Sequence, residues 1–358
     1  MPEKNKTKEK MTMANPLVKK ILAGTVALII LGAIAYGANL GNKSTGSTVE
    51  TAKGGGLDKL RTWSRKDCSS TPWAVGVVKG FFKEEGLEIV FTGDTQPSQQ
   101  IPSMLNGNND IGGNHPNALA VAIAAGAKIK GVVKGGIDPF PEQDPKLRHM
   151  NWYINPEVTP DIKTFADLNK LAAKGPVKFS TITNNICADF LANNIADKQG
   201  FARDKIEWVS MPDIQSVQAL KKGLVAVAGV HPPFYKSMED AGMVKIADSL
   251  DAGLGQAGGV TYYAFTTDFI EKNPDVVKRF SKAITKAQKW SNENPEEARK
   301  ITEQWIQVPV SATHYYAGDT EISEAMVTPW IQDLEQAGII AKGKVTAKDL
   351  VATNLYAK

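Results

Sequence analysis

Residues 177–200 read VKFSTITNNICADFLANNIADKQG, and this stretch decides the fold class. It begins with a strand pattern over residues 177–182 and continues with a helical pattern from about residue 184 to residue 199, which Gly200 ends. The unit then repeats, with a strand, a helix and a strand expected at 206–210, 214–222 and 225–230. Alternating strands and helices predict an α/β fold with mostly parallel sheets.

The same alternation occurs earlier in the chain. Thr71 and Pro72 suit the N-cap and first position of a helix, and Gly86 suits its end. Strands are expected at 87–92, 110–113 and 129–133, and helices around 101–105 and at 116–125. Two matched halves predict a two-lobed molecule, with one lobe from residues 57–150 and 255–358 and the other from 151–254.

The remaining segments complete this scheme. Residues 137–146 (IDPFPEQDPK) contain too many prolines for regular structure. A strand at 260–265 is expected to return to the first lobe. Amphipathic patterns then predict three helices, at 276–292, 296–306 and 323–337.

The charge of the chain is concentrated at its N-terminus. The 42 Lys and Arg residues exceed the 38 Asp and Glu residues by four, and the first twenty residues hold six lysines but only two glutamates. The rest of the chain is therefore balanced, which argues against a nucleic-acid partner. Residues 21–38 are uncharged and apolar, and eighteen helical residues span about 27 Å.

These features predict the topology of the N-terminal region. A basic cytoplasmic tail (1–20) would precede a membrane anchor or a signal segment (21–38), and a Gly-rich flexible linker (39–56) would follow. A retained anchor is favoured because the apolar run exceeds the usual 7 to 15 residues of a signal peptide. We therefore expect the folded part outside the cytoplasm, anchored by a single pass, or secreted if the segment is cleaved.

The sequence offers few patterns for catalysis. None of the four histidines has an HxxxH or HxH partner, so local spacing predicts no metal site. There is no GxSxG, P-loop or GxGxxG motif, and no base is placed near either cysteine. A disulfide between Cys68 and Cys187 is not favoured, because the two residues fall in different predicted lobes. We expect no catalytic residues, no cofactor and no metal.

Polar residues at helix starts, just beyond strand ends, are the candidate ligand contacts. Ligands of open α/β sheets bind at such places, where helix N-termini direct backbone N–H groups at polar atoms. Each residue could instead only cap its own helix. His231, followed by two prolines, ends the last strand of the second lobe and could face the same cleft. The candidates are Ser64, Arg65, Cys68, Ser70, Thr71, Trp73, Asn114, His115, Thr181, Thr183, Asn184, Asn185 and His231, with Trp63 as a further stacking surface.

Several segments together carry a resemblance to a known family. They include KGFFKEEGLEIVF (79–91), MLNGNNDIGG (104–113), ALAVAIAAGAKIKGVV (118–133), KTFADLNKLAAKGPVKFST (163–181), HPPF (231–234) and TTDFIEKNPDVVKRFSKA (266–283). In this order they resemble the extracytoplasmic solute-binding proteins of ABC importers, in the nitrate, sulfonate, taurine and thiamine-precursor group. The resemblance implies a type 2 periplasmic-binding-protein fold, whose lobes close over one ligand and are joined by crossing strands at 152–154 and 260–265.

The resemblance also implies a function and partners. We expect a monomer that captures a small anionic organic solute, such as a sulfonate, taurine or nitrate, and delivers it to the permease and ATPase subunits of an importer. Alternatives are a heteroaromatic solute, such as a thiamine pyrimidine precursor or a flavin, and an enzyme of the thiamine-precursor or thiol-dependent type. The chain departs from many relatives at Pro232-Pro233, where they have Glu-Pro, and it lacks the cysteine-rich motif of the related enzymes.

Overall fold

A computed structural model of the chain describes residues 56–94, 96–352 and 355, which all belong to one compact unit, Thr45–Lys358. The predicted tail and anchor, and all of the predicted linker except Gly56, lie outside the described residues. Within the part that is described, no helix is long and apolar enough to cross a bilayer.

Two small sheets form from strands before residue 135 together with the later strand β11 (Tyr262–Thr266). Strands β1 (Asp58–Ser64) and β2 (Leu87–Asp94) pair in parallel, and helices α2 (Thr71–Val78) and α3 (Phe81–Glu84) connect them. The second sheet has the order β3-β11-β4, from Gly112–Asn114, Tyr262–Thr266 and Ile129–Lys134. Helix α4 (Pro97–Leu105) precedes β3, and α5 (Pro116–Ala124) follows it.

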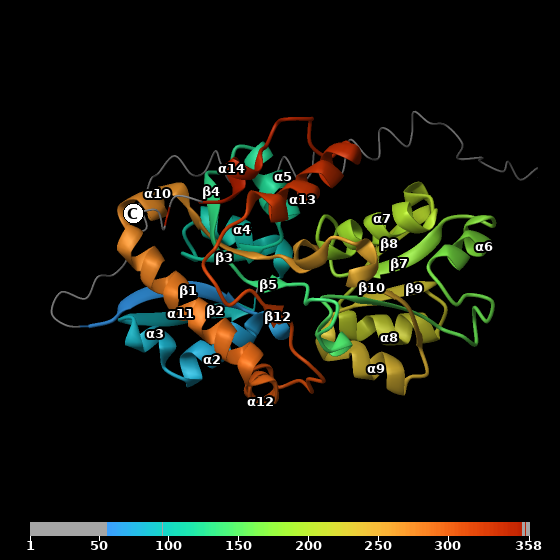
Figure 1. Cartoon of the computed structure of the whole chain (residues 1–358), viewed down its shortest axis with the longest axis horizontal. Coiled ribbons are helices and arrows are strands. Elements are labelled where there is room, and N and C mark those ends of the chain that lie inside the picture. Colours follow the sequence, from blue (N-terminus) through green and yellow to red (C-terminus); the bar gives the residue numbers. More distant parts are fainter. Residues whose placement is uncertain (1–55, 95, 353–354, 356–358) are drawn as a thin grey trace, which may run out of the picture. The chain divides into compact units, whose positions relative to one another are not determined.

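A five-stranded sheet forms from residues 151–248. Figure 1 shows helix α7 (Cys187–Gln199) on one side of this sheet and helices α8 (Asp213–Lys221) and α9 (Tyr235–Asp240) on the other. Gly200 ends α7 in the left-handed conformation (φ 70°) that glycine adopts without strain. The strand order is β10-β6-β9-β7-β8, from Val244–Asp248, Asn151–Ile154, Val227–Val230, Val177–Thr181 and Ile206–Ser210.

The expectation of mostly parallel sheets is only partly correct. Strand β7 is parallel to both β8 and β9, as a strand-helix-strand repeat requires. However, β6 runs antiparallel to β9 and β10, and β11 runs antiparallel to β3 and β4. The antiparallel strands β6 and β11 directly follow the two passages of the chain between the sheets. The fold is therefore mixed α/β.

The chain passes between the sheets in residues 138–150 and 249–261. The strands expected to cross, at 152–154 and 260–265, correspond to β6 and β11, which lie inside the sheets. The two passages contact each other, because the Asp138 backbone N–H donates to the Gln256 carbonyl (3.2 Å) and the Ser249 hydroxyl donates to Asp138 Oδ1 (2.7 Å). Strands β5 (Gly136–Ile137) and β12 (Tyr315–Tyr316) pair beside them, so part of the Pro-rich segment is regular.

The C-terminal helices pack on the first sheets (Figure 1). Helix α11 (Pro274–Glu293) begins at a proline and buries Val277, Phe280 and Ile284 on one face. It contacts α2, and Phe280 packs there against Trp73. The other helices are α6 (Asn169–Ala172), α10 (Thr267–Lys272), α12 (Pro295–Ile306), α13 (Glu324–Gln336) and α14 (Ala347–Leu350). Short 3-10 turns lie at Cys68–Ser70, Pro145–Leu147, Ala166–Leu168, Arg203–Lys205, Pro232–Phe234, Ser249–Ala252 and Gly255–Gly259.

Candidate functional site

A cavity of about 80 Å³ lies where the three-stranded and five-stranded sheets meet. The three-stranded sheet contributes Gly113 and Asn114 from the end of β3 and Tyr262 and Tyr263 from β11. Residues beside strands β6, β7 and β9 of the five-stranded sheet line the opposite side. The lining is Trp63, Arg65, Asp67, Ser69, Pro97, Gln100, Gly113, Asn114, His115, Gly136, His149, Ile182, Ile186, Cys187, His231, Thr261, Tyr262, Tyr263, His314 and Tyr316.

All four histidines of the chain line this cavity. The ring centre of His149 lies 5.1 Å from that of His115, 5.4 Å from that of His231 and 4.8 Å from that of His314. Each histidine is at most 9% exposed. Four segments that are distant in the sequence therefore bring their imidazoles into one buried cluster.

Local structure explains where each ring sits. His115 directly follows β3 and is the N-cap residue of α5, and His149 lies just before β6. His231 follows β9, and His314 precedes β12. Strand ends and helix starts thus hold the four rings, as expected for a ligand site in an α/β fold.

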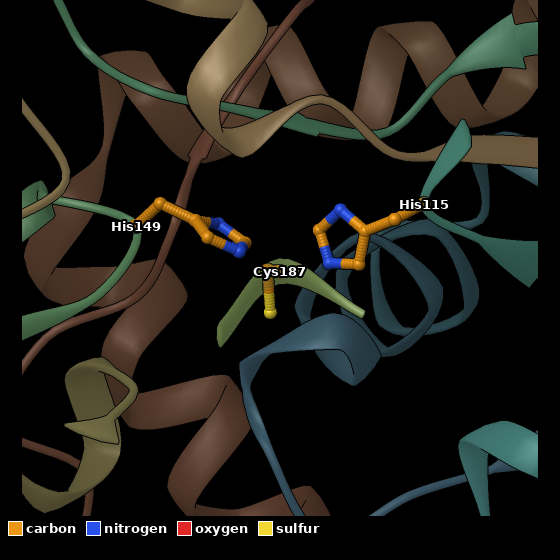
Figure 2. Close-up of side chains that lie close together, drawn as sticks. All are labelled: His115, His149 and Cys187. Carbon is orange, nitrogen blue, oxygen red and sulfur yellow. The ribbon is translucent and has the colours of Figure 1, made fainter. Parts of the chain in front are cut away.

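Cys187 completes the cluster (Figure 2). It is the first residue of α7 and is only 1% exposed. Donor atoms of His115, His149 and Cys187 all lie within 4.8 Å of one another. Figure 2 shows the imidazoles of His115 and His149 pointing toward each other, with the Cys187 side chain beside the space between them.

A short chain of polar contacts leads away from the thiol. Cys187 Sγ lies 3.2 Å from His231 Nε2, and His231 Nδ1 lies 2.7 Å from Asp213 Oδ2. The same Asp213 oxygen also accepts the backbone N–H of His231 (3.1 Å). The carboxylate therefore fixes both the backbone and the ring of His231.

Electrostatics divides the cluster into charged and neutral members. Burial works against ionisation of Cys187, but the charges of His115 and His231 lower the pKa of the thiol well below its usual range. Burial would likewise lower the pKa of His231, but the Asp213 carboxylate raises it well above its usual range. Both shifts favour the ionised forms, a thiolate on Cys187 and an imidazolium on His231.

His149 and His314 are neutral. Burial lowers the pKa of His149 to about 4, and burial together with the neighbouring histidines lowers the pKa of His314 well below its usual range. In the described part of the chain, no hydrogen bond of ordinary geometry reaches either ring nitrogen of His149. His115 Nδ1 lies 2.9 Å from the Val260 carbonyl oxygen. The contact to Val260 therefore uses Nδ1 and does not involve the other ring nitrogen, Nε2.

The cavity has no uncompensated basic residue among the residues described. Among the described residues that line the cavity, Arg65 is the one Lys or Arg. It forms an ion pair with Asp67, which also lines the cavity. Further out, Lys134 Nζ pairs with Asp319 Oδ1 at 2.9 Å. The imidazoles and the thiol therefore dominate the chemistry of the cavity.

The structure places four of the sequence-predicted residues in this lining: Arg65, Asn114, His115 and His231. Ser64 lies with Arg65 along a neighbouring depression, where its hydroxyl donates to Asp94 (3.1 Å). Thr181 donates to the Thr183 carbonyl (2.7 Å). Thr181, Thr183, Asn184 and Asn185 are outside the cavity lining.

Four other predicted residues are buried away from the cavity. The Cys68 thiol donates to the Ala312 carbonyl (3.1 Å), and the Ser70 hydroxyl donates to the Arg65 carbonyl (2.6 Å). Thr71 shares a hydrogen bond with Thr302 (2.7 Å). Trp73 is fully buried against Trp63, Phe82, Phe91, Tyr263 and Phe280, so its predicted ligand contact is replaced by a core role. Trp63, the other stacking candidate, does line the cavity.

Sequence reasoning missed His149, Cys187 and His314. The sequence places no base near Cys187, and the absence of paired histidine motifs argues against a metal site. The one signal in the sequence is that histidine and cysteine are rare in it. The chain has only four histidines and two cysteines, and five of these six residues line one cavity. Both cysteines are free.

Comparison with known proteins gives a consistent result. The model of the NMT1-like family matches residues 66–307. A Brucella abortus protein described only as a binding protein is 24% identical over 238 residues, which is 66% of this chain and 67% of the relative.

Two solved structures show the same fold. The periplasmic aliphatic sulphonate-binding protein SsuA of Escherichia coli superposes with a TM-score of 0.64 at 16% identity, over 82% of this chain and 92% of SsuA. The periplasmic nitrate-binding protein NrtA of Synechocystis PCC 6803 superposes with a TM-score of 0.67 at 12% identity, over 84% of this chain and 87% of NrtA.

Proposed function

This chain belongs to the NMT1-like family, and on that premise we propose that it is the extracytoplasmic solute-binding component of an ABC importer. It has the mixed α/β fold of periplasmic solute-binding proteins. The single observation that carries the proposal is the cavity, whose lining comes from both the first sheets and the five-stranded sheet.

The mechanism is capture by closure. Residues 57–150 and 255–358 form one lobe, residues 151–254 form the other, and a solute that contacts both lobes favours the closed state. The closed form then docks on a permease, which an ATPase drives. The protein acts as a monomer, is held at the membrane by residues 21–38, and binds its solute without turnover.

A small anion, such as a sulfonate or nitrate, is the first ligand class to test. The names of SsuA and NrtA support it, as do polar lining residues such as Ser69, Asn114 and Thr261. A flat heteroaromatic solute is the second class, because Trp63 and Tyr262 line the cavity and each has a buried polar atom without a partner in the described part.

A thermal-unfolding panel tests the proposal. Sulfonates, nitrate, pyrimidines and flavins would be added in turn, because a ligand at 100 times its Kd stabilises the native state by about 2.7 kcal/mol. Small-angle scattering of the stabilised samples should show a smaller radius of gyration. If no solute class shifts the melting temperature or the radius, the protein is not a capture module.

One observation favours a second candidate function, a thiol-dependent enzyme. Cys187 contacts His231, and His231 contacts Asp213. This chain of contacts is the arrangement of a nucleophile, a base and a carboxylate that orients the base. Among the described residues, the hydrogen-bond partner of the Cys68 thiol is instead the Ala312 carbonyl. A burst of product from an activated ester that disappears in Cys187→Ser would support the enzyme, whereas a change in solute affinity alone would support the binding protein.

A further inference from the structure

We propose that the cavity binds a zinc-class divalent transition-metal ion through Nε2 of His115, a ring nitrogen of His149 and Sγ of Cys187. The inference rests on the proposed function, because it names the class of solute that the cavity captures. The metal ion binds alone or together with a small anion.

The three donor atoms are close enough to share one ion. They lie within 4.8 Å of one another. Tetrahedral zinc has bonds of about 2.0 to 2.3 Å, which place neighbouring donor atoms about 3.5 Å apart. Changes in side-chain torsion that move each donor by about 1 Å are therefore sufficient, and the lobes need not rearrange.

The donors are also available. His149 is 2% exposed, and neither of its ring nitrogens has a hydrogen-bond partner of ordinary geometry in the described part of the chain. A buried polar atom without a partner is energetically unfavourable, so a bound ion would remove a penalty that the protein otherwise carries. His115 uses Nδ1 on the Val260 carbonyl, an arrangement that fixes the ring with Nε2 free to bind a metal.

Asp213 and His231 prepare the third donor. Metal ions bind the thiolate form of cysteine. His231 Nε2 lies 3.2 Å from Sγ, and the Asp213 carboxylate contacts the opposite ring nitrogen at 2.7 Å, so Asp213 fixes the ring that lies against the sulfur. His231 is therefore a positioning residue for the thiolate and is not counted among the ligands.

The donor set selects the class of ion. Imidazole and thiolate ligands suit zinc, cobalt, nickel and copper, whereas calcium and magnesium require oxygen ligands. The lining contains one carboxylate, Asp67, and Arg65 pairs with it. Three protein ligands leave one tetrahedral position open, and a dication with one thiolate gives the cavity a net positive charge. An anion could then bind directly to the metal.

Metal titration of the purified, chelator-treated folded protein tests the proposal. We expect isothermal titration with ZnCl₂ alone to give one ion per chain, and Co²⁺ to give a thiolate-to-cobalt charge-transfer absorption. Cys187→Ser and His149→Ala should each lower the affinity by at least 10-fold and remove or shift this absorption. Cys68→Ser is the matched control, because Cys68 is equally buried but lies outside the cavity lining, and it should leave both signals unchanged.

The other outcomes decide between the two proposals. Absence of saturable zinc binding in the wild type, or zinc affinity that is unchanged in Cys187→Ser, overturns the metal site, and a thermal shift with sulfonate would still support the solute-binding function. Zinc binding supports the metal site whether or not the radius of gyration decreases, and the samples with sulfonate or nitrate are the ones that test capture by closure. The zinc titration is then repeated with sulfonate or nitrate present. Tighter zinc binding shows that the ion binds together with the anion, and unchanged affinity shows that the ion binds alone.

Discussion

Cys187 Sγ and His231 Nε2 lie 3.2 Å apart although 44 positions separate the two residues in the sequence. Cys187 begins the helix after β7, and His231 follows β9, the strand that neighbours β7. The pairing of these two parallel strands therefore brings the thiol and the imidazole together. The carboxylate of Asp213 then orients the imidazole.

Asp213→Asn should weaken zinc binding by about 10- to 100-fold, because loss of a partner that orients a site residue typically has this effect. The variant keeps all three proposed ligands, so the cobalt charge-transfer absorption should persist at saturating cobalt. Isothermal titration and absorption spectra check the two expectations. Asp319→Asn is a control for the removal of a carboxylate outside the cavity lining, and equal losses in both variants would contradict a specific role for Asp213.

His149 should make the metal-free protein less stable in acid. Its native pKa is about 4 against 6.5 for an unperturbed histidine, so the unfolded chain binds more protons between these values. The free energy of unfolding should therefore fall as the pH decreases from 6.5 to 4, by about 3 kcal/mol from this residue. The ionisable groups that face His149 are His115, His231, His314 and Cys187.

Comparison with His149→Gln isolates that contribution. Urea unfolding at several pH values in the presence of a chelator should give a flatter curve for the variant than for the wild type. Parallel curves would contradict a buried, neutral His149.

Trp73→Ala should destabilise the protein by about 3 to 5 kcal/mol, because Trp73 is fully buried and its ring contacts five other aromatic rings. Denaturant unfolding would measure the loss, and Trp73→Phe should retain more stability because it leaves a smaller cavity. A normal unfolding curve together with lost solute binding would instead assign Trp73 to ligand contact.

Gly259→Ala should destabilise the passages between the sheets. A Cβ at this position would lie 2.6 Å from the Asp138 backbone nitrogen and 2.8 Å from the Ile137 carbonyl carbon, and backbone atoms cannot move aside as a flexible side chain can. A cost of about 1 to 3 kcal/mol is expected. Gly136→Ala is the matched control, because its nearest contact would be an ordinary 3.7 Å, and thermal unfolding should separate the two variants. Equal melting temperatures would disprove the steric argument.

Local patterns predicted most elements of the fold. The strand at 206–210 has the same bounds as β8, and the helix expected at 296–306 differs from α12 by one residue. The helix expected from residue 184 begins only at Cys187, because Asn185 adopts a positive φ of 59° and its N–H bonds to Asp189. The directions of β6 and β11 could not be predicted, since periodicity carries no information on which strand lies alongside.

The candidate site was less predictable. Strand ends indicated Asn114, His115 and His231 as candidate ligand contacts, and the structure places all three in the cavity lining. His149 and His314 lie in irregular segments before short strands, and Cys187 is the first residue of a helix that otherwise has an ordinary amphipathic pattern. Their proximity depends on tertiary structure, which local spacing cannot reveal.

The ion pair between Arg65 and Asp67 has a consequence for the rate of the proposed solute capture. Because this pair compensates charge in the cavity lining and the chain is balanced beyond residue 20, the cavity has no strong long-range field to attract a charged solute. Association should then proceed at an unsteered, diffusive rate constant that changes little with ionic strength, whereas electrostatically steered association slows steeply in salt. Discrimination between solutes would consequently lie in how long each one stays bound.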